Sequence, residues 1–312
     1  MVDPWRDGSI VAGTASAAPD PDRAGTASAS GSRLAGRTPV DRQARLWELA
    51  GRLTDRDRQL CQLLAEHRVL TTAQVADVAF TGLRKAQRRL VVLHHLEVVD
   101  RFRPRCWAGS GPYHFTLGPA GAAVVAADRG IPAGDLGWRR DTAAALALSQ
   151  RLGHTVGVNG FFTTLLRTAR TRPECELAQW WSERRAAAAW GELVRPDGYA
   201  VWVDGPARLP FVLEYDTGTE RLARLAAKLD GYAALARAAD HPTWVLFTFP
   251  TPGREAAARP VLAHPEVPVA TAVLRPGAAP DGPCWLAVGD PGPRRRLADL
   301  GHPPRVLPSS RP

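Results

Sequence analysis

The sequence predicts a mixed α+β or α/β protein of two domains. The first is helical and ends in a β-hairpin, and the second is built of layered strands and helices. The chain has 312 residues, a length that usually corresponds to about two domains. Hydrophobic residues make up 45% and charged residues 23% of it, as in ordinary globular proteins. Helical periodicity dominates up to residue 130, and strand-like runs dominate the second half.

Both ends of the chain have the composition of tails. Residues 1–40 are rich in Ala, Gly, Ser, Pro and Asp, and such a segment has too few apolar side chains to build a core, so we expect disorder. Residues 291–312 are basic and Pro-rich, and we expect a loose tail there. Between the tails we expect domains at 41–130 and 141–290, joined by a Pro- and Gly-containing linker at 131–140.

The N-terminal domain reads as three helices followed by a hairpin. Thr54 and either Thr71 or Thr72 are N-cap residues for the first two helices. The third helix follows Gly82 and has one apolar stripe at helical spacing. Two strand-like runs near residues 98–102 and 113–117 then flank a long turn. The stripe consists of Leu83, Ala86, Leu90 and Leu93. This order of elements is that of a winged helix-turn-helix domain.

Basic residues are concentrated on the third helix and the hairpin. The chain has a formal net charge of +9, which favours polyanionic partners. In a helix-turn-helix domain the third helix enters the major groove, and flanking groups contact phosphates. We therefore expect double-stranded DNA as a partner. The predicted DNA-binding residues are Arg84, Lys85, Arg88, Arg89, Arg101, Arg103 and Arg105.

The second domain carries a set of acidic residues near the ends of two predicted strands. Asp197 precedes one strand, and Glu214 and Asp216 end the next. If the strands pair as a hairpin, Asp197 lies level with Asp216 and next to Glu214, while the latter two share one face. Like charges at that distance repel and require a cation. Hard oxygen ligands suit Mg²⁺, so these three residues form a predicted metal site with Mg²⁺ as the only expected cofactor.

This acidic pattern resembles the PD-(D/E)xK motif of the restriction-endonuclease-like fold, and the order of strands and helices is similar to that fold. The resemblance implies a catalytic role for Asp197, Glu214 and Asp216. The sequence departs from the motif at Asp216, where the family has a lysine. Some members of the superfamily supply the lysine from the following helix. Lys228 is one of only two lysines in the chain, and it is the candidate, although it also fits an ordinary surface residue whose stem lies along the core.

The segments EYDTGTE and KLDGY, together with the winged-helix half, resemble the replication-relaxation family of actinobacterial and plasmid-associated proteins. The resemblance covers roughly residues 50–275. It implies a DNA-binding accessory protein in the replication, relaxation or transfer of a plasmid or integrative element, with a replication protein or relaxase as a partner. It leaves open whether the nuclease-like domain cuts DNA. The alternatives are a Mg²⁺-dependent DNA endonuclease and a winged-helix transcription regulator whose second domain senses a ligand.

Several other classes of protein are not indicated. No run of 18 apolar residues is present, and the first thirty residues carry six charged side chains in place of a signal core, so we expect a cytoplasmic protein. The four cysteines lack metal-ligand spacing and are expected to be buried hydrophobes. The sequence has no GxxxxGK or HExxH motif. We expect Glu183 and Glu220 at the surface and the tryptophans of the second domain in its core.

Overall fold

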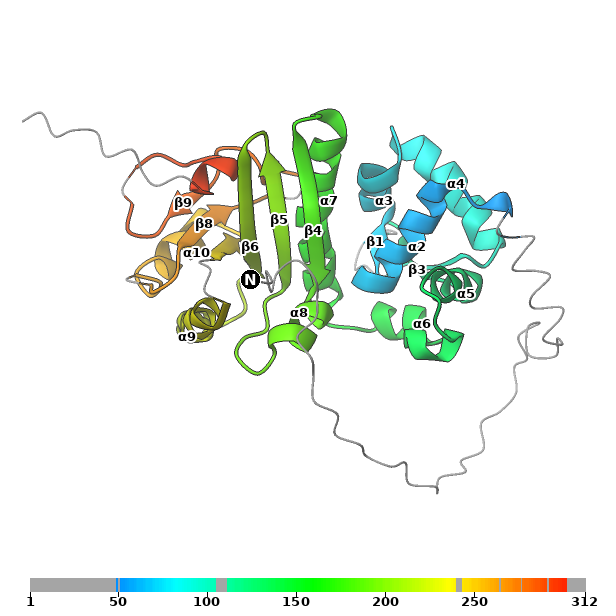
Figure 1. The fold of residues 1–312 in the computed structure, drawn as a ribbon, viewed down its shortest axis with the longest axis horizontal. Helices are drawn as coiled ribbons and strands as arrows, with labels where there is room; N and C mark the ends of the chain where they lie inside the picture. Colours follow the sequence, from blue (N-terminus) through cyan, green and yellow to red (C-terminus); the bar gives the residue numbers. More distant parts are fainter. Residues whose placement is uncertain are drawn as a thin grey trace, which may run out of the picture. The chain divides into compact units, whose positions relative to one another are not determined.

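Helices and strands follow one another along the chain, and the strands form two β-sheets (Figure 1). The computed structural model describes residue 49 and residues 51–104, 111–239, 243–263, 265–275, 277–290 and 292–301. The predicted tail at 1–40 and residues 302–312 of the tail predicted at 291–312 lie outside these ranges, and so does Arg105. From Asp55 onward the chain forms one compact unit.

The first part of this unit contains the predicted helices and hairpin. Its helices are α2 (Asp55–His67), α3 (Thr72–Ala79), α4 (Leu83–His95) and α5 (Pro119–Asp128). Its strands are β1 (Leu70–Thr71), β2 (Val99–Phe102) and β3 (His114–Leu117), arranged in the order β1-β3-β2 with antiparallel pairing. The short strand β1 is absent from the sequence prediction because two residues show no periodicity.

Thr71 fixes the start of α3, because its side chain accepts a hydrogen bond from the Gln74 amide while the Gln74 side chain accepts one from the Thr71 amide. The apolar stripe of α4 is buried at Ala86, Leu90 and Leu93. Leu83 is 48% exposed, so its predicted place in the stripe is wrong. Residues 81–85 around the start of the helix are all exposed, and Ala86 is the first residue of α4 that is buried. Leu83 therefore precedes the part of the helix that packs on the core.

The predicted linker is an ordered, packed segment. It contains the short helix η1 (Ala133–Leu136), and the Trp138 indole N–H donates to the carbonyl of Leu117 at 2.8 Å. The following helix α6 (Thr142–Ala147) places Leu146 in a small apolar cluster with Val69 and Leu152. Residues 131–147 therefore pack against the N-terminal elements and do not form an unstructured linker between two domains.

Helix α7 (Leu152–Thr171) runs without a break through Gly157 and Gly160, although glycine inside a helical pattern often marks an interruption. Gly157 is needed for close packing, because a Cβ there would lie 2.5 Å from the ring of Tyr215. A glycine that admits a neighbouring side chain looks the same in sequence as one that ends a helix.

The second sheet has six strands in the order β4-β5-β6-β7-β8-β9. Strands β4 to β6 form an antiparallel meander, β6, β7 and β8 are parallel, and β9 is antiparallel to β8. The strands are β4 (Cys175–Ser182), β5 (Gly198–Asp204), β6 (Ala207–Tyr215), β7 (Trp244–Phe249), β8 (Val269–Val273) and β9 (Leu286–Ala287). The helices that connect them are α8 (Glu183–Trp190), α9 (Leu222–Ala239) and α10 (Pro252–Ala258).

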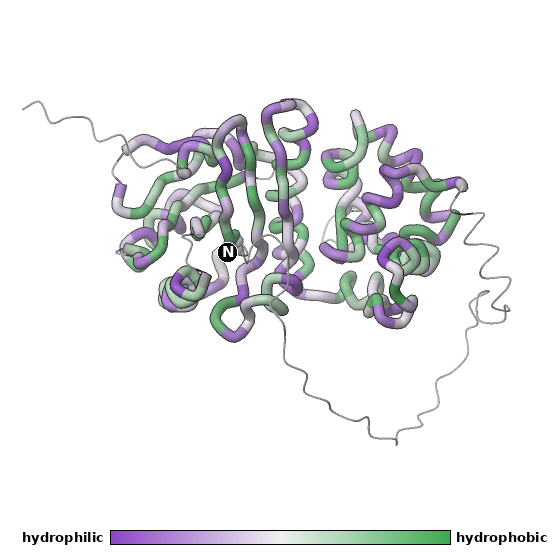
Figure 2. Tube along the Cα trace, in the orientation of Figure 1, coloured by the Kyte–Doolittle hydropathy of each residue, from purple (hydrophilic) through white to green (hydrophobic). Residues whose placement is uncertain are grey.

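Helix α7 covers one face of this sheet with Phe161, Phe162 and Leu165, which pack with Trp202 and Phe211. The central strands are accordingly hydrophobic along their length (Figure 2). Of the tryptophans predicted to lie in the core, the buried ones are Trp181, Trp190, Trp202 and Trp285, and the half-buried ones are Trp180 and Trp244. Because side chains alternate along a strand, residues such as Glu214 point to the opposite face, toward α9.

The predicted loose tail from residue 291 is wrong for residues 292–301. Leu297 and Leu300 are buried in the same core, and the segment ends in the short helix η2 (Ala298–Gly301). The basic run holds this segment in place, since Arg294 pairs with Glu255 and Arg296 pairs with Asp204. Two buried leucines and two ion pairs thus attach this Pro-rich segment to the sheet domain.

No helix in the described ranges is both long and apolar enough to cross a membrane. Cys61 and Cys175 are buried and Cys284 is half-buried, each as a free thiol, while Cys106 lies outside the described residues. Burial raises the pKa of the Cys61 thiol to about 12, which keeps it protonated and unreactive.

Candidate functional site

The outer face of α4 carries three of the predicted DNA-binding residues. Arg84, Lys85 and Arg88 are exposed, on the side opposite the buried stripe. The Lys85 ammonium donates to the Thr81 hydroxyl at 3.0 Å, which holds it at the start of the helix. The result is a cationic surface on one helix face, which is the charge pattern that contacts DNA phosphates.

Arg89 does not belong to this surface. Its guanidinium makes two hydrogen bonds to the carboxylate of Asp57 on α2, at 3.0 and 2.6 Å. Asp57 is only 1% exposed, and a buried carboxylate needs such a partner. The helical position of Arg89 lies beside the buried stripe and not opposite it. Its predicted role in DNA binding is therefore replaced by a structural one.

The hairpin places its arginines around one tyrosine. The guanidinium of Arg101 lies 4.7 Å and that of Arg103 lies 3.8 Å from the centre of the Tyr113 ring. These cation–π contacts fix both side chains near the loop end of the hairpin. Tyr113 thus packs within the hairpin, and of the predicted hairpin cations only Arg105 lies outside the described residues.

Strands β5 and β6 do pair as a hairpin, with a register that differs from the predicted one. Asp204 pairs with Ala207, which leaves a two-residue turn at Gly205 and Pro206. Gly198 pairs with Leu213, so Asp197 lies opposite Glu214 and not level with Asp216. The prediction was off by two residues because the sequence does not reveal how tight the turn is.

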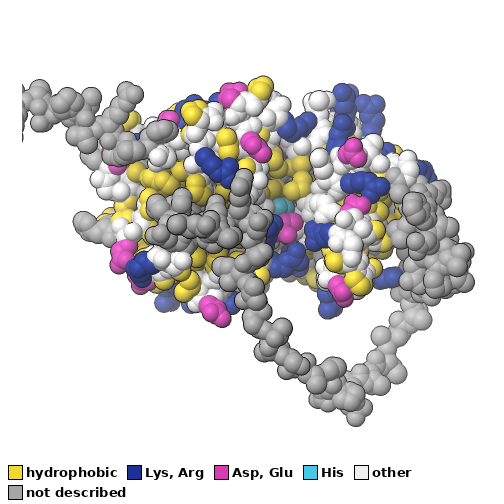
Figure 3. Space-filling model, viewed as in Figure 1, with side chains coloured by type: hydrophobic (Ala, Val, Ile, Leu, Met, Phe, Trp, Pro, Cys, Tyr) yellow, Lys and Arg dark blue, Asp and Glu magenta, His cyan; other side chains and the backbone are white. Residues whose placement is uncertain are grey.

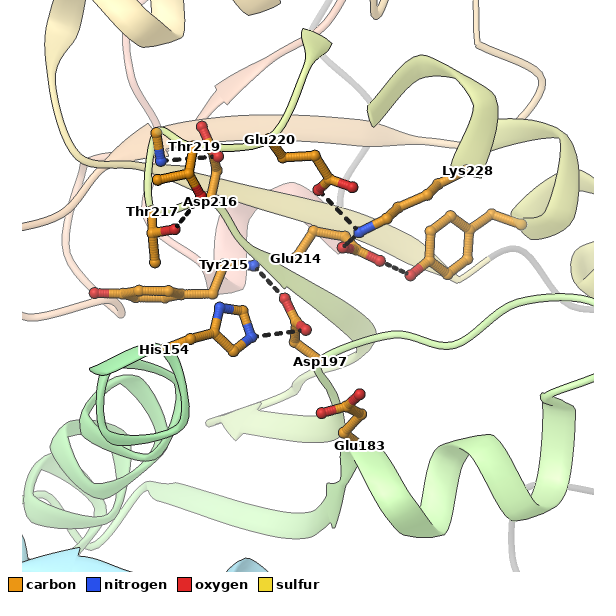
Figure 4. A network of polar contacts seen from close by, with 12 residues as sticks. His154, Glu183, Asp197, Glu214, Tyr215, Asp216, Thr217, Thr219, Glu220 and Lys228 are labelled. Carbon is orange, nitrogen blue, oxygen red and sulfur yellow. Dashed lines mark hydrogen bonds and ion pairs between the residues drawn. The ribbon is translucent and has the colours of Figure 1, made fainter. Parts of the chain in front are cut away.

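The carboxylate of Asp197 joins α7 to the end of β6. One oxygen lies 2.9 Å from His154 Nε2, and the other accepts the backbone N–H of Tyr215 at 2.8 Å (Figure 4). Burial alone would lower the pKa of His154, but the hydrogen bond and the charge of Asp197 raise it above its ordinary value. His154 was not predicted, since nothing near it in the sequence marks a site.

Glu214 is the most buried acid of the site, at 2% exposure. It accepts a hydrogen bond from the Lys228 ammonium at 2.6 Å and another from the Tyr232 hydroxyl. Burial, together with the nearby charge of Asp197, raises the pKa of Glu214 to about 7 against the opposing effect of Lys228. Lys228 therefore points at the acids, as the candidate lysine should (Figure 4).

Asp216 has a separate partner. Arg254 of α10 donates to one of its oxygens at 2.6 Å, and the amide of Gly218 donates to the other at 2.9 Å. Arg254 also bonds the carbonyl of Glu220, whose carboxylate lies 3.5 Å from Lys228. Asp216, which stands where the motif has its lysine, thus holds the loop between β6 and α9. Glu220 lies at the edge of the site.

The three predicted Mg²⁺ ligands are engaged with protein groups in this arrangement. Every oxygen of Asp197, Glu214 and Asp216 already accepts a protein donor. In the described part of the chain, ligand atoms of metal-binding type come together only at Glu174, Cys175 and Asp204. Those acids are paired with Arg172 and Arg296. We therefore derive no chemical step through a metal ion.

The site thus contains two carboxylates, a lysine, a histidine and a tyrosine, which come from α7, β6, α9 and the residue before β5. Sequence reasoning missed His154, Tyr232 and Arg254. A signal existed for Tyr232, because it lies four residues after Lys228 on the same face of α9. For His154 and Arg254 no such signal exists, since only the tertiary fold brings them to the acids. Glu183 is at the surface as expected and pairs with Arg151 at 3.0 Å.

Comparison with known proteins identifies one family. No curated protein and no solved structure matches the chain. The family model of replication-relaxation proteins matches residues 61–245, from within α2 to the start of β7. That range includes α4, the β5–β6 hairpin and Lys228, and it covers more than half of the chain. The chain belongs to the replication-relaxation family.

Proposed function

We propose that the protein is a DNA-binding accessory factor in the replication, relaxation or transfer of a plasmid or integrative element. Membership of the replication-relaxation family indicates a role in replication or relaxation. The observation that carries DNA binding is the exposed cationic face of α4, formed by Arg84, Lys85 and Arg88. A replication protein or a relaxase is the proposed protein partner.

The arrangement around α4 supports a winged helix-turn-helix interpretation. Helices α2, α3 and α4 precede the β2–β3 hairpin, and α3 packs on α4. In such a domain α4 enters the major groove and the hairpin lies along the backbone. Arg101 and Arg103 lie near the loop end of this hairpin, where they would add phosphate contacts. We further propose that the six-stranded sheet is a restriction-endonuclease-like domain.

The test is duplex DNA binding over a range of salt concentrations. Replacing Arg84 and Arg88 with Ala is expected to weaken binding and to lower the slope of log K against log salt by roughly one unit or somewhat more. The matched control replaces Arg208 and Arg237, two exposed arginines of the second sheet and α9, and removes the same charge. If both double variants change the slope equally, α4 is not the DNA-binding helix.

A second candidate function is nuclease activity at the acidic site. It is favoured by the Lys228 ammonium at 2.6 Å from Glu214, with Asp197 on the neighbouring strand. This combination of two acids and a lysine is that of the PD-(D/E)xK motif, with the lysine taken from α9. Lys228 is partly exposed, so its ammonium can also reach a phosphate at the rim of the site.

Nuclease activity is tested on supercoiled plasmid with Mg²⁺, with Mn²⁺ and with a chelator. We expect weak cutting or none by the wild type, and loss of any cutting in Lys228→Ala with duplex affinity retained, because binding is assigned to α4. Robust cutting that survives both Lys228→Ala and Asp197→Ala would assign the chemistry to another site. The third candidate, a transcription regulator with a sensor domain, calls for an apolar pocket, whereas the cavity at this site has many charged residues.

A further inference from the structure

A cleft of about 460 Å³ opens beside the His154–Asp197 end of the candidate site. Its walls come from the end of α2, the segment before α6, the starts of α7 and α8, and the residues before β5. Figure 3 shows Lys and Arg side chains gathered around a hollow that also holds a histidine and an acidic side chain. The cleft is lined by residues from Leu64 to Asp197, so it lies entirely within the unit that begins at Asp55.

Cations outnumber acids in the lining. The acids are Glu66, Glu183 and Asp197, and each already accepts hydrogen bonds from protein groups. Glu66, for example, accepts the amide and the hydroxyl of Ser182. The arginines of the lining are Arg68, Arg139, Arg151, Arg184 and Arg195. An arginine fork with five donors is well suited to phosphate oxygens.

Two of these arginines have no acidic partner. Within the described ranges, neither Arg68 nor Arg195 forms an ion pair with any carboxylate. Arg195 donates only weakly, to the carbonyl of Gly191 at 3.4 Å. Arg139 and Arg151 are in exposed ion pairs with Asp141 and Glu183, and such pairs exchange readily for another anion. Arg184 lies 3.9 Å from the half-buried Glu66.

Arg68 also has an unusual backbone. It follows the last residue of α2 with φ of 70°, a left-handed conformation that favours glycine at the end of a helix. An arginine there costs conformational energy that a glycine would avoid. Its backbone N–H ends the helix on the carbonyl of Leu64 at 3.0 Å, and its exposed side chain lines the cleft.

The walls of the cleft are fixed before any ligand enters. Asn159 of α7 donates to the carbonyls of His67 and Val69 at 3.2 and 2.7 Å. The His67 ring stacks on Trp180 at 3.5 Å between centroids. A rigid anion site loses less entropy when it binds than a mobile one does.

We propose that this cleft binds an unpaired stretch of a DNA strand through its phosphates and presents it to the His154–Asp197 end of the site. The volume lies within the roughly 300–1,000 Å³ of small-ligand pockets, which suits one or two nucleotides and excludes a duplex. This inference rests on the proposed function that the protein acts on DNA. It adds a second, single-strand site apart from the duplex surface of α4.

The test measures fluorescence anisotropy of the full chain with a short labelled oligothymidylate and with a blunt duplex. The cleft variant combines Arg68→Gly with Arg195→Gln. It is expected to bind the oligothymidylate about tenfold or more weakly, with duplex affinity within about twofold of wild type. The matched variant with Arg84→Gln and Arg88→Gln is expected to show the reverse pattern.

Arg68→Gly also separates binding from folding. Because glycine relieves the left-handed backbone, the single variant is expected to keep or raise the melting temperature while it weakens oligothymidylate binding. Unchanged oligothymidylate affinity in the folded cleft variant, or no binding by the wild type, overturns the cleft proposal. If duplex affinity is insensitive to the α4 variant while the cleft variant loses the oligothymidylate, the α4 assignment fails and the cleft stands. Competition by inorganic phosphate as strong as by the oligothymidylate would show a free-anion site and overturn the proposal.

Discussion

At the scale of single residues, three buried acids of the described part of the chain are each held by a basic side chain from another element. Asp57 is paired with Arg89, Glu214 with Lys228 and Asp216 with Arg254. Removing one partner of such a pair leaves an uncompensated buried charge and costs about 3–5 kcal/mol. Part of the high arginine content is therefore structural, and a count of arginines and lysines overstates the number of cations available to a polyanionic partner.

His67 gives a prediction of pH dependence. It is buried, and this burial lowers the pKa of the imidazole to about 3. Between that value and the ordinary value near 6.5, the unfolded chain binds a proton that the folded chain does not, so stability falls as the pH is lowered. The loss due to His67 is expected to reach about 2 kcal/mol by pH 5.

The measurement is urea unfolding of the wild type and of His67→Phe between pH 7 and pH 5. Phenylalanine keeps a ring against Trp180 but cannot take up a proton. The free energy of unfolding of the variant is expected to vary less with pH than that of the wild type. Equal pH dependence in the two proteins would assign the effect to other groups.

At the scale of elements, the loop between β6 and α9 is held by the start of α10. Arg254 bonds the carboxylate of Asp216 and the carbonyl of Glu220, and Asp216 itself caps the amide of Gly218, which has φ of 87°. The loop carries the EYDTGTE segment, so α10 positions the part of the chain that leads into Lys228. Such positioning residues affect a site without touching what it binds.

Arg254→Ala is expected to destabilise the protein by about 3–5 kcal/mol, because it leaves Asp216 buried and unpaired. Hydrogen exchange at Gly218 and Thr219 is expected to increase more than exchange in β7. Arg237→Ala, which breaks an exposed ion pair with Glu266, serves as the control and is expected to change neither quantity measurably. Loop exchange equal to wild type in the Arg254 variant would contradict the role assigned to α10.

At the scale of the whole unit from Asp55 onward, α7 connects the helical half to the six-stranded sheet. Its Asn159 bonds the chain after α2, Arg170 donates to carbonyls at the end of α3, and Phe161 and Phe162 pack on the sheet. Glu66 adds a further link to Ser182 at the end of β4. We therefore expect the two halves to unfold in one cooperative transition.

Asn159→Ala removes the bonds to two buried carbonyls, at a cost of about 1–3 kcal/mol. Calorimetry is expected to show a lower melting temperature and a broadened or split transition. Thr163→Ala is the matched control, since its hydroxyl bonds only within α7, to Gly160, and this variant is expected to keep a single transition. A single sharp transition in both variants would show that these contacts do not couple the halves.

The sequence by itself determined the local elements and the chemistry available to them. Periodicity predicted α4 with its buried Ala86 and Leu90, and the order of strands predicted the sheet around Glu214. The scarcity of lysine singled out Lys228. These features are local because they depend on residues within a few positions of one another.

Only the tertiary structure decided which residues meet. It paired Arg89 with Asp57 and Arg254 with Asp216, brought His154 to Asp197, and packed residues 292–301 into the core. Those contacts join positions tens of residues apart, and no periodicity records them. The register that set Asp197 opposite Glu214 followed from a tight turn that composition leaves open. An arginine that the fold places beside a buried acid pairs with that acid and is not available to another anion. The reason is that a buried carboxylate needs a partner of opposite charge, and the fold can supply one from a distant part of the sequence.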